Sequence, residues 1–178
     1  MLPSDFGFLA NDNLPSHEHI VAMCEEAGYD RTGISFPNLP GKPIAWIKYG
    51  PHVKMAEALT QDWVAKDLDA KPEANVRVPR VYDAFSSTHT AFPIGYIVME
   101  YIDAPDCTKR DVKLVAQAVQ TLISIRGPNS EPGPVGGGPI VHSFFVDEGT
   151  SPLTYETVEE LQQHMNGVSK FPVHLGPR

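Results

Sequence analysis

The sequence has only two cysteines, no run of basic residues and no long hydrophobic segment. Cys24 and Cys107 lie far apart and form no Cys-x-x-Cys spacing, so we expect reduced structural thiols and no zinc site. No segment approaches the roughly 20 apolar residues that a helix needs to cross a bilayer. The N-terminus also lacks the basic start and apolar run of a secretion signal. These absences predict a cytoplasmic protein.

Positive charge is also scarce. The chain has 14 basic and 22 acidic residues, which gives a formal net charge of −8. Nucleic acids and anionic membranes attract proteins through basic surfaces, so neither is expected as a partner. The length of 178 residues allows one ordinary domain, or one lobe of a larger enzyme and part of the next. Hydrophobic residues make up 42% of the chain, which excludes wholesale disorder.

Helical and strand patterns alternate in the first 105 residues. A helix with Ser16 as its N-cap is expected first, and glycine and proline bound the runs of β-forming residues that follow. In the second helix, Ala56, Leu59 and Trp63 recur at helical spacing and predict its buried stripe. The pattern predicts helices over 15–26 and 54–68, strands over 32–36 and 44–49, and a hairpin of strands 76–85 and 94–101.

The remainder of the chain predicts two helices separated by a loop rich in proline and glycine. A capping box at Thr108 and Asp111 opens the first, whose apolar residues keep helical spacing until Gly127. The loop covers residues 127–138. The last helix is expected over residues 155–165, with Asn166 and Gly167 ending it.

Lys48 ends a strand that is otherwise apolar, and such a lysine must reach solvent or find an anionic partner. Glu57 follows nine residues later on the predicted helix, in the order in which kinases place a phosphate-binding lysine and the glutamate that holds it. We predict an ion pair between the two side chains. Taken alone, a lysine at a strand end is more often a solvated terminus.

The segment Met99-Glu100-Tyr101-Ile102 is similar to the passage from strand to hinge in the protein-kinase-like fold. Lys48, Glu57, residues 78–82 and residues 96–103 follow one another as in the small lobe of the aminoglycoside phosphotransferase and choline kinase-like family, fungal type, which the chain therefore resembles.

The resemblance implies an α+β fold in which a small antiparallel sheet packs on the Glu57 helix, followed by part of a large lobe. It implies ATP as the cofactor, with Mg²⁺ only in a full-length form, and phosphoryl transfer to a small-molecule hydroxyl. It makes Lys48, Glu57, Met99, Glu100 and Ile102 the cofactor-binding residues. Met99 would line the back of the pocket, Glu100 would offer its carbonyl oxygen, and Ile102 its amide N–H. An ordinary strand leaving a sheet is the alternative for this segment.

Two features depart from the family pattern. No His-x-Asp is followed by a downstream Asn, so no catalytic or metal-binding residue is assigned and an inactive, truncated member is expected. Trp46 lies two residues before Lys48, where kinases keep a small residue against the adenine.

The expected parts are a helical segment (1–26), a kinase-like small lobe (27–105) and a partial large lobe (106–178). A non-catalytic module that binds another protein or itself is the alternative function.

Overall fold

The computed structural model describes residues 7–37, 42–71, 73–89, 92–145 and 149–167, leaving out the side chain of Pro37. The chain divides into two compact units, Met1–Ile125 and Arg126–Arg178. Each unit is described by itself. The domain boundaries predicted at residues 26 and 105 stay predictions.

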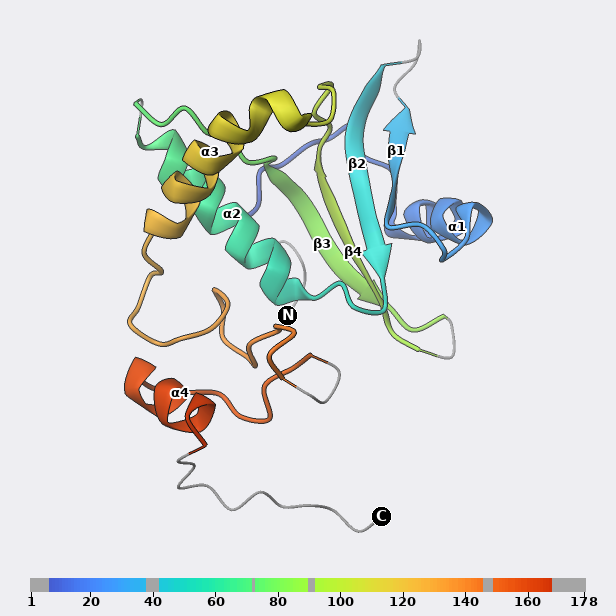
Figure 1. Cartoon of the computed structure of the whole chain (residues 1–178). Helices are drawn as coiled ribbons and strands as arrows, with labels where there is room; N and C mark the ends of the chain where they lie inside the picture. The colour runs from blue at the N-terminus through green and yellow to red at the C-terminus, as the bar shows by residue number, and fades with distance from the viewer. Residues whose placement is uncertain (1–6, 38–41, 72, 90–91, 146–148, 168–178) are drawn as a thin grey trace. The chain divides into compact units, whose positions relative to one another are not determined.

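The first unit is built on a four-stranded antiparallel sheet (Figure 1). Its spatial order is β1-β2-β4-β3, so β2 and β4 are the central strands. Helix α2 (Met55–Asp69) connects β2 to β3, and β3 and β4 form a hairpin. The α+β class predicted from the sequence is confirmed. The strands are β1 (Gly33–Pro37), β2 (Pro43–Gly50), β3 (Val81–Ser87) and β4 (Ile94–Glu100).

Helix α1 (His17–Ala27) covers one face of this sheet. The hydroxyl of Ser16 accepts a hydrogen bond from the backbone N–H of His19, as the predicted N-cap requires. Alternation along β2 turns every second side chain to this face. The core here includes Ile20, Cys24, Ile47, Tyr49 and Tyr96. Burial raises the pKa of the Cys24 thiol to about 12, consistent with the predicted structural role.

Helix α2 (Met55–Asp69) packs on the opposite face. Its buried residues are Ala58, Ala65 and Leu68, whereas Ala56, Leu59 and Trp63 are only half-buried. The predicted stripe was therefore wrong, although the helix was placed correctly. Small alanines let the helix approach the sheet closely, and the larger side chains lie beside that contact.

Strand β3 begins at Val81, five residues later than predicted. Residues 76–80, which include Pro79, precede the strand, and a proline has no N–H to donate to a neighbouring strand. Pro79 instead accepts a hydrogen bond at its carbonyl oxygen from the Gln61 amide of α2, at 2.8 Å. β3 lies at an edge of the sheet.

After the sheet, a 3₁₀ turn η2 (Lys109–Asp111) leads into helix α3 (Val112–Ser124). The predicted capping box between Thr108 and Asp111 is present. The backbone and side-chain hydrogen bonds from Thr108 lower the pKa of the Asp111 carboxyl. None of the α3 side chains is buried, and six large apolar ones are exposed: Val112, Leu114, Val115, Val119, Leu122 and Ile123.

The second unit contains helix α4 (Val158–Met165) and an isolated bridge between Val141 and Thr150. Thr157 caps α4, so the helix starts three residues later than predicted, and Gly167 follows its end with a φ of +71°. The aromatic side chains of Phe145 and Tyr155 are buried in this unit.

Candidate functional site

Lys48 and Glu57 form the predicted ion pair, from the Lys48 ammonium to a Glu57 carboxylate oxygen. Lys48 lies on β2 between Gly33 of β1 and Ile97 of β4, and Glu57 lies in the first turn of α2. The strand therefore supplies the cation and the covering helix supplies the anion. The pair joins the sheet to the helix on the α2 face.

The ion pair contributes little to stability. The Lys48 and Glu57 side chains are 37% and 38% exposed, so water screens their attraction. Exposed pairs of this kind contribute about 0–1 kcal/mol. The pair instead holds the ammonium in a fixed place while leaving it accessible, which is what binding of an external anion requires.

Trp46 lies on the same sheet face as Lys48, as strand alternation predicted. Its indole lies over Gly33 of β1, and a Cβ added to Gly33 would come within 2.6 Å of the ring. The absence of a side chain at Gly33 therefore makes room for the indole. Whether the ring fills an adenine slot stays a prediction.

A cavity of about 400 Å³ opens beside the ion pair. Its walls come from the segment before β1, the end of β2, the connection from β2 to α2 and the first turn of α2. The hydroxyl of Tyr49 donates to the Gly28 carbonyl oxygen at 2.6 Å, and burial raises the pKa of this phenol. The cavity is lined by Tyr29, Arg31, Thr32, Lys48, Tyr49, Gly50, Pro51, His52, Val53 and Glu57.

Strand β4 ends at the segment that carries Met99, Glu100 and Ile102. Met99 is buried opposite Trp46 in the sheet register. The Glu100 carboxylate pairs with Arg77, and the Glu100 backbone N–H donates to the Arg80 carbonyl oxygen at 2.8 Å. Ile102 is 41% exposed and follows the strand. None of these three residues lines the cavity beside Lys48. Their roles at an adenine stay predictions.

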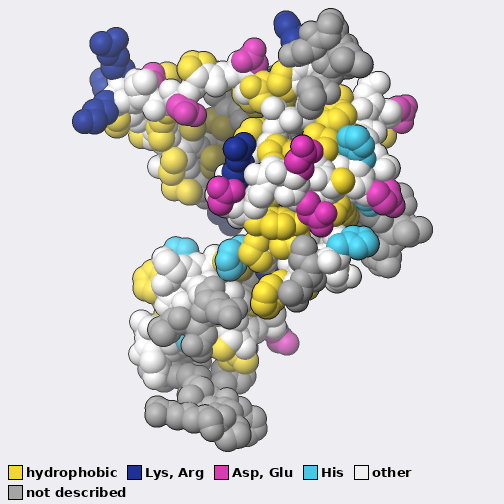
Figure 2. Space-filling view, turned by 90° about the vertical axis from the view of Figure 1, so that its right-hand side faces the viewer, with side chains coloured by type: hydrophobic (Ala, Val, Ile, Leu, Met, Phe, Trp, Pro, Cys, Tyr) yellow, Lys and Arg dark blue, Asp and Glu magenta, His cyan; other side chains and the backbone are white. Residues whose placement is uncertain are grey.

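Histidine and acidic side chains are prominent on the face shown in Figure 2. One histidine is fixed: His17 Nε2 lies 2.6 Å from an Asp83 carboxylate oxygen, and its ring stacks on Phe85 with centroids 3.8 Å apart. Within the described ranges, no three or more His, Cys, Asp or Glu residues are grouped so as to hold a metal ion.

Comparisons with family models, curated proteins and solved structures found no match. In the described part of the chain, every helix is too short or too polar to cross a membrane.

Proposed function

We propose that the first unit is the small lobe of a phosphotransferase related to the aminoglycoside phosphotransferase and choline kinase-like family, and that it binds ATP through Lys48. The observation that carries the proposal is the Lys48–Glu57 ion pair, made between a central strand and the helix that follows it. A lysine held in this way supplies a fixed cation for nucleotide phosphates. The proposal concerns binding, since the sequence holds no His-x-Asp motif with a downstream Asn for the transfer step.

The sheet order supports the same proposal. β4 pairs directly with β2, so Met99 and Glu100 lie across from the beginning of the strand that carries Lys48. The chain leaves the sheet after Glu100. Phosphate and adenine contacts would therefore come from neighbouring strands, which suits an extended ligand such as a nucleotide.

Lys48→Ala is expected to weaken ATP binding by about tenfold to a hundredfold, the usual effect of losing a hydrogen bond to a charged group. Isothermal titration of the wild type and the variant with ATP measures this. Lys71→Ala is the matched control, because Lys71 also pairs with a carboxylate, that of Asp67, but on the surface at the end of α2. Circular dichroism checks that both variants remain folded. Equal ATP affinity in Lys48→Ala, or no saturable binding by the wild type, would contradict the proposal.

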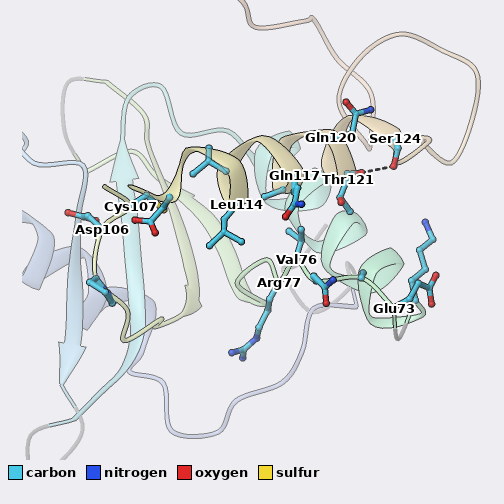
Figure 3. A pocket seen from close by; sticks show the side chains of 17 residues that line it. Glu73, Val76, Arg77, Asp106, Cys107, Leu114, Gln117, Gln120, Thr121 and Ser124 are labelled. Carbon is cyan, nitrogen blue, oxygen red and sulfur yellow. Dashed lines mark hydrogen bonds between the residues drawn. The ribbon is translucent and has the colours of Figure 1, made fainter. Parts of the chain in front are cut away.

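A non-catalytic interaction module is the second candidate, and the exposed apolar face of α3 favours it. Leu114 is 65% exposed and Ile123 is 70% exposed. Beneath the helix lies an open groove of about 1000 Å³, which is shared with Lys71 and residues 73–77 (Figure 3). Leu114 and Thr121 point from α3 toward Val76, whereas Gln120 and Ser124 point away. An amphipathic helix with so much exposed apolar surface is typical of a protein contact.

Self-association through α3 is expected if this second candidate is correct. Sedimentation velocity should then show a dimer that Val119→Glu/Ile123→Glu converts to a monomer, because two charges cannot be buried unpaired at a contact. Gln120→Glu/Ser124→Glu adds the same charge where the side chains of α3 point away from Val76, and it should leave the dimer intact. A wild type that stays monomeric at all concentrations, together with ATP binding that depends on Lys48, would favour the first candidate instead.

A further inference from the structure

The cavity beside Lys48 holds a second permanent cation that the ion pair does not use. Arg31 lies just before β1 and His52 lies between β2 and α2, and both line the cavity. The loop before β1 and the loop after β2 therefore place two basic residues at one concavity. Glu57 is the only carboxylate among the lining residues, and it is engaged by Lys48.

This local charge is opposite to that of the whole chain, whose formal net charge is −8. Arg31 and Lys48 each carry a positive charge and Glu57 a negative one, so the lining has a net charge of one positive unit when His52 is neutral. A protonated His52 would add a second positive unit. Asp30 lies next to Arg31 in the sequence but is not among the lining residues. A cavity with positive walls in an acidic protein concentrates anions of small molecules while the remaining surface repels polyanions.

The size and the lining of the cavity limit the class of anion. A volume of about 400 Å³ is at the small end of the range for ligand pockets, which runs from about 300 to 1,000 Å³. Lys48 and Glu57 form one wall from β2 and α2, whereas Arg31 and His52 come from the adjoining loops. An arginine fork binds phosphate with two parallel hydrogen bonds, and an imidazole N–H donates one more.

We propose that Arg31 and His52 hold the outer phosphates of a polyphosphate whose inner phosphate lies at Lys48, so that the cavity selects triphosphates over monophosphates. The proposal rests on the proposed function, since it assigns the ligand of the same site. It adds two binding residues and a preference for phosphate number.

The test compares three ligands by isothermal titration: ATP, AMP and inorganic tripolyphosphate. Arg31→Gln and His52→Gln are each expected to weaken the binding of ATP and of tripolyphosphate about tenfold, the effect of losing one hydrogen bond to a charged group. The affinity for AMP should change less than about twofold, because AMP lacks the outer phosphates. Arg80→Gln is the matched control: Arg80 pairs with Asp69, outside the cavity, and its loss removes the same charge.

The outcomes separate this inference from the proposed function. If Lys48→Ala weakens ATP but Arg31→Gln and His52→Gln do not, the inference is overturned and ATP binding at Lys48 stands. If tripolyphosphate binds as tightly as ATP and needs Arg31 and His52, the inference holds and the nucleotide proposal fails. If Arg80→Gln weakens the binding of ATP and tripolyphosphate as much as Arg31→Gln does, the effect is one of general charge and the inference is overturned. The absence of saturable binding by all three ligands would overturn both proposals.

Discussion

Gly95→Ala is expected to destabilise the first unit by about 3 kcal/mol, the upper part of the usual range for overpacking. Gly95 lies on β4 opposite Gly50 of β2 and Ser86 of β3. A Cβ at this position would meet the backbone carbonyl oxygen of Val53. That oxygen belongs to the short segment between β2 and α2, so it cannot turn away as a side chain would. Relief would require the segment or the strand to shift.

Urea unfolding followed by circular dichroism measures the change in the free energy of unfolding for Gly95→Ala. Gly127→Ala is the control, because the nearest atom to a Cβ there, the Asn129 carbonyl oxygen, lies 3.6 Å away, an ordinary contact. The control should stay within about 0.5 kcal/mol of the wild type. A Gly95→Ala variant as stable as Gly127→Ala would show that the close approach of Val53 to β4 is wrong.

Tyr96→Ala is expected to cost about 3–5 kcal/mol, the usual loss when a large buried aromatic side chain is truncated. Tyr96 is 1% exposed on β4 and belongs to the core beneath α1. Its ring stacks on Phe85 with centroids 4.8 Å apart and lies 6.3 Å from that of Tyr49. Removing the ring would leave a cavity between these two aromatic neighbours.

Tyr96→Phe keeps the ring and removes only the hydroxyl. Burial raises the pKa of the Tyr96 phenol, so the hydroxyl stays protonated, and its loss should cost about 1 kcal/mol. The same urea unfolding measures both variants. Equal losses in the alanine and phenylalanine variants would show that the hydroxyl, rather than the stacked ring, stabilises this core.

Much of the fold was predictable because local patterns agree with it. The apolar run around Ile47 predicted β2, and the Ser16 and Thr108 caps marked helix starts that the structure contains. The buried face of α2 was not predictable in the same way. Apolar residues lie on several sides of this helix. The side that packs against the sheet carries Ala58 and Ala65, whose small side chains allow close packing.

The site was predictable only in part. Lys48 and Glu57 stood out because a strand lysine needs a partner and the helix supplies one at a suitable place. Arg31 and His52 gave no such signal, since each lies in a loop whose position depends on the tertiary structure. The indole of Trp46 over Gly33 likewise depends on strand register, and neither residue alone indicates that contact.

The contact between His17 and Asp83 has a consequence for how the sheet opens. Helix α1 packs beside β1 at one edge, while His17 at its first turn reaches Asp83 on β3, the strand at the opposite edge. Helix α1 therefore contacts both edge strands of the sheet. Because of these two contacts, we expect local opening at one edge to disturb the other, and the sheet and α1 to unfold as a single cooperative unit.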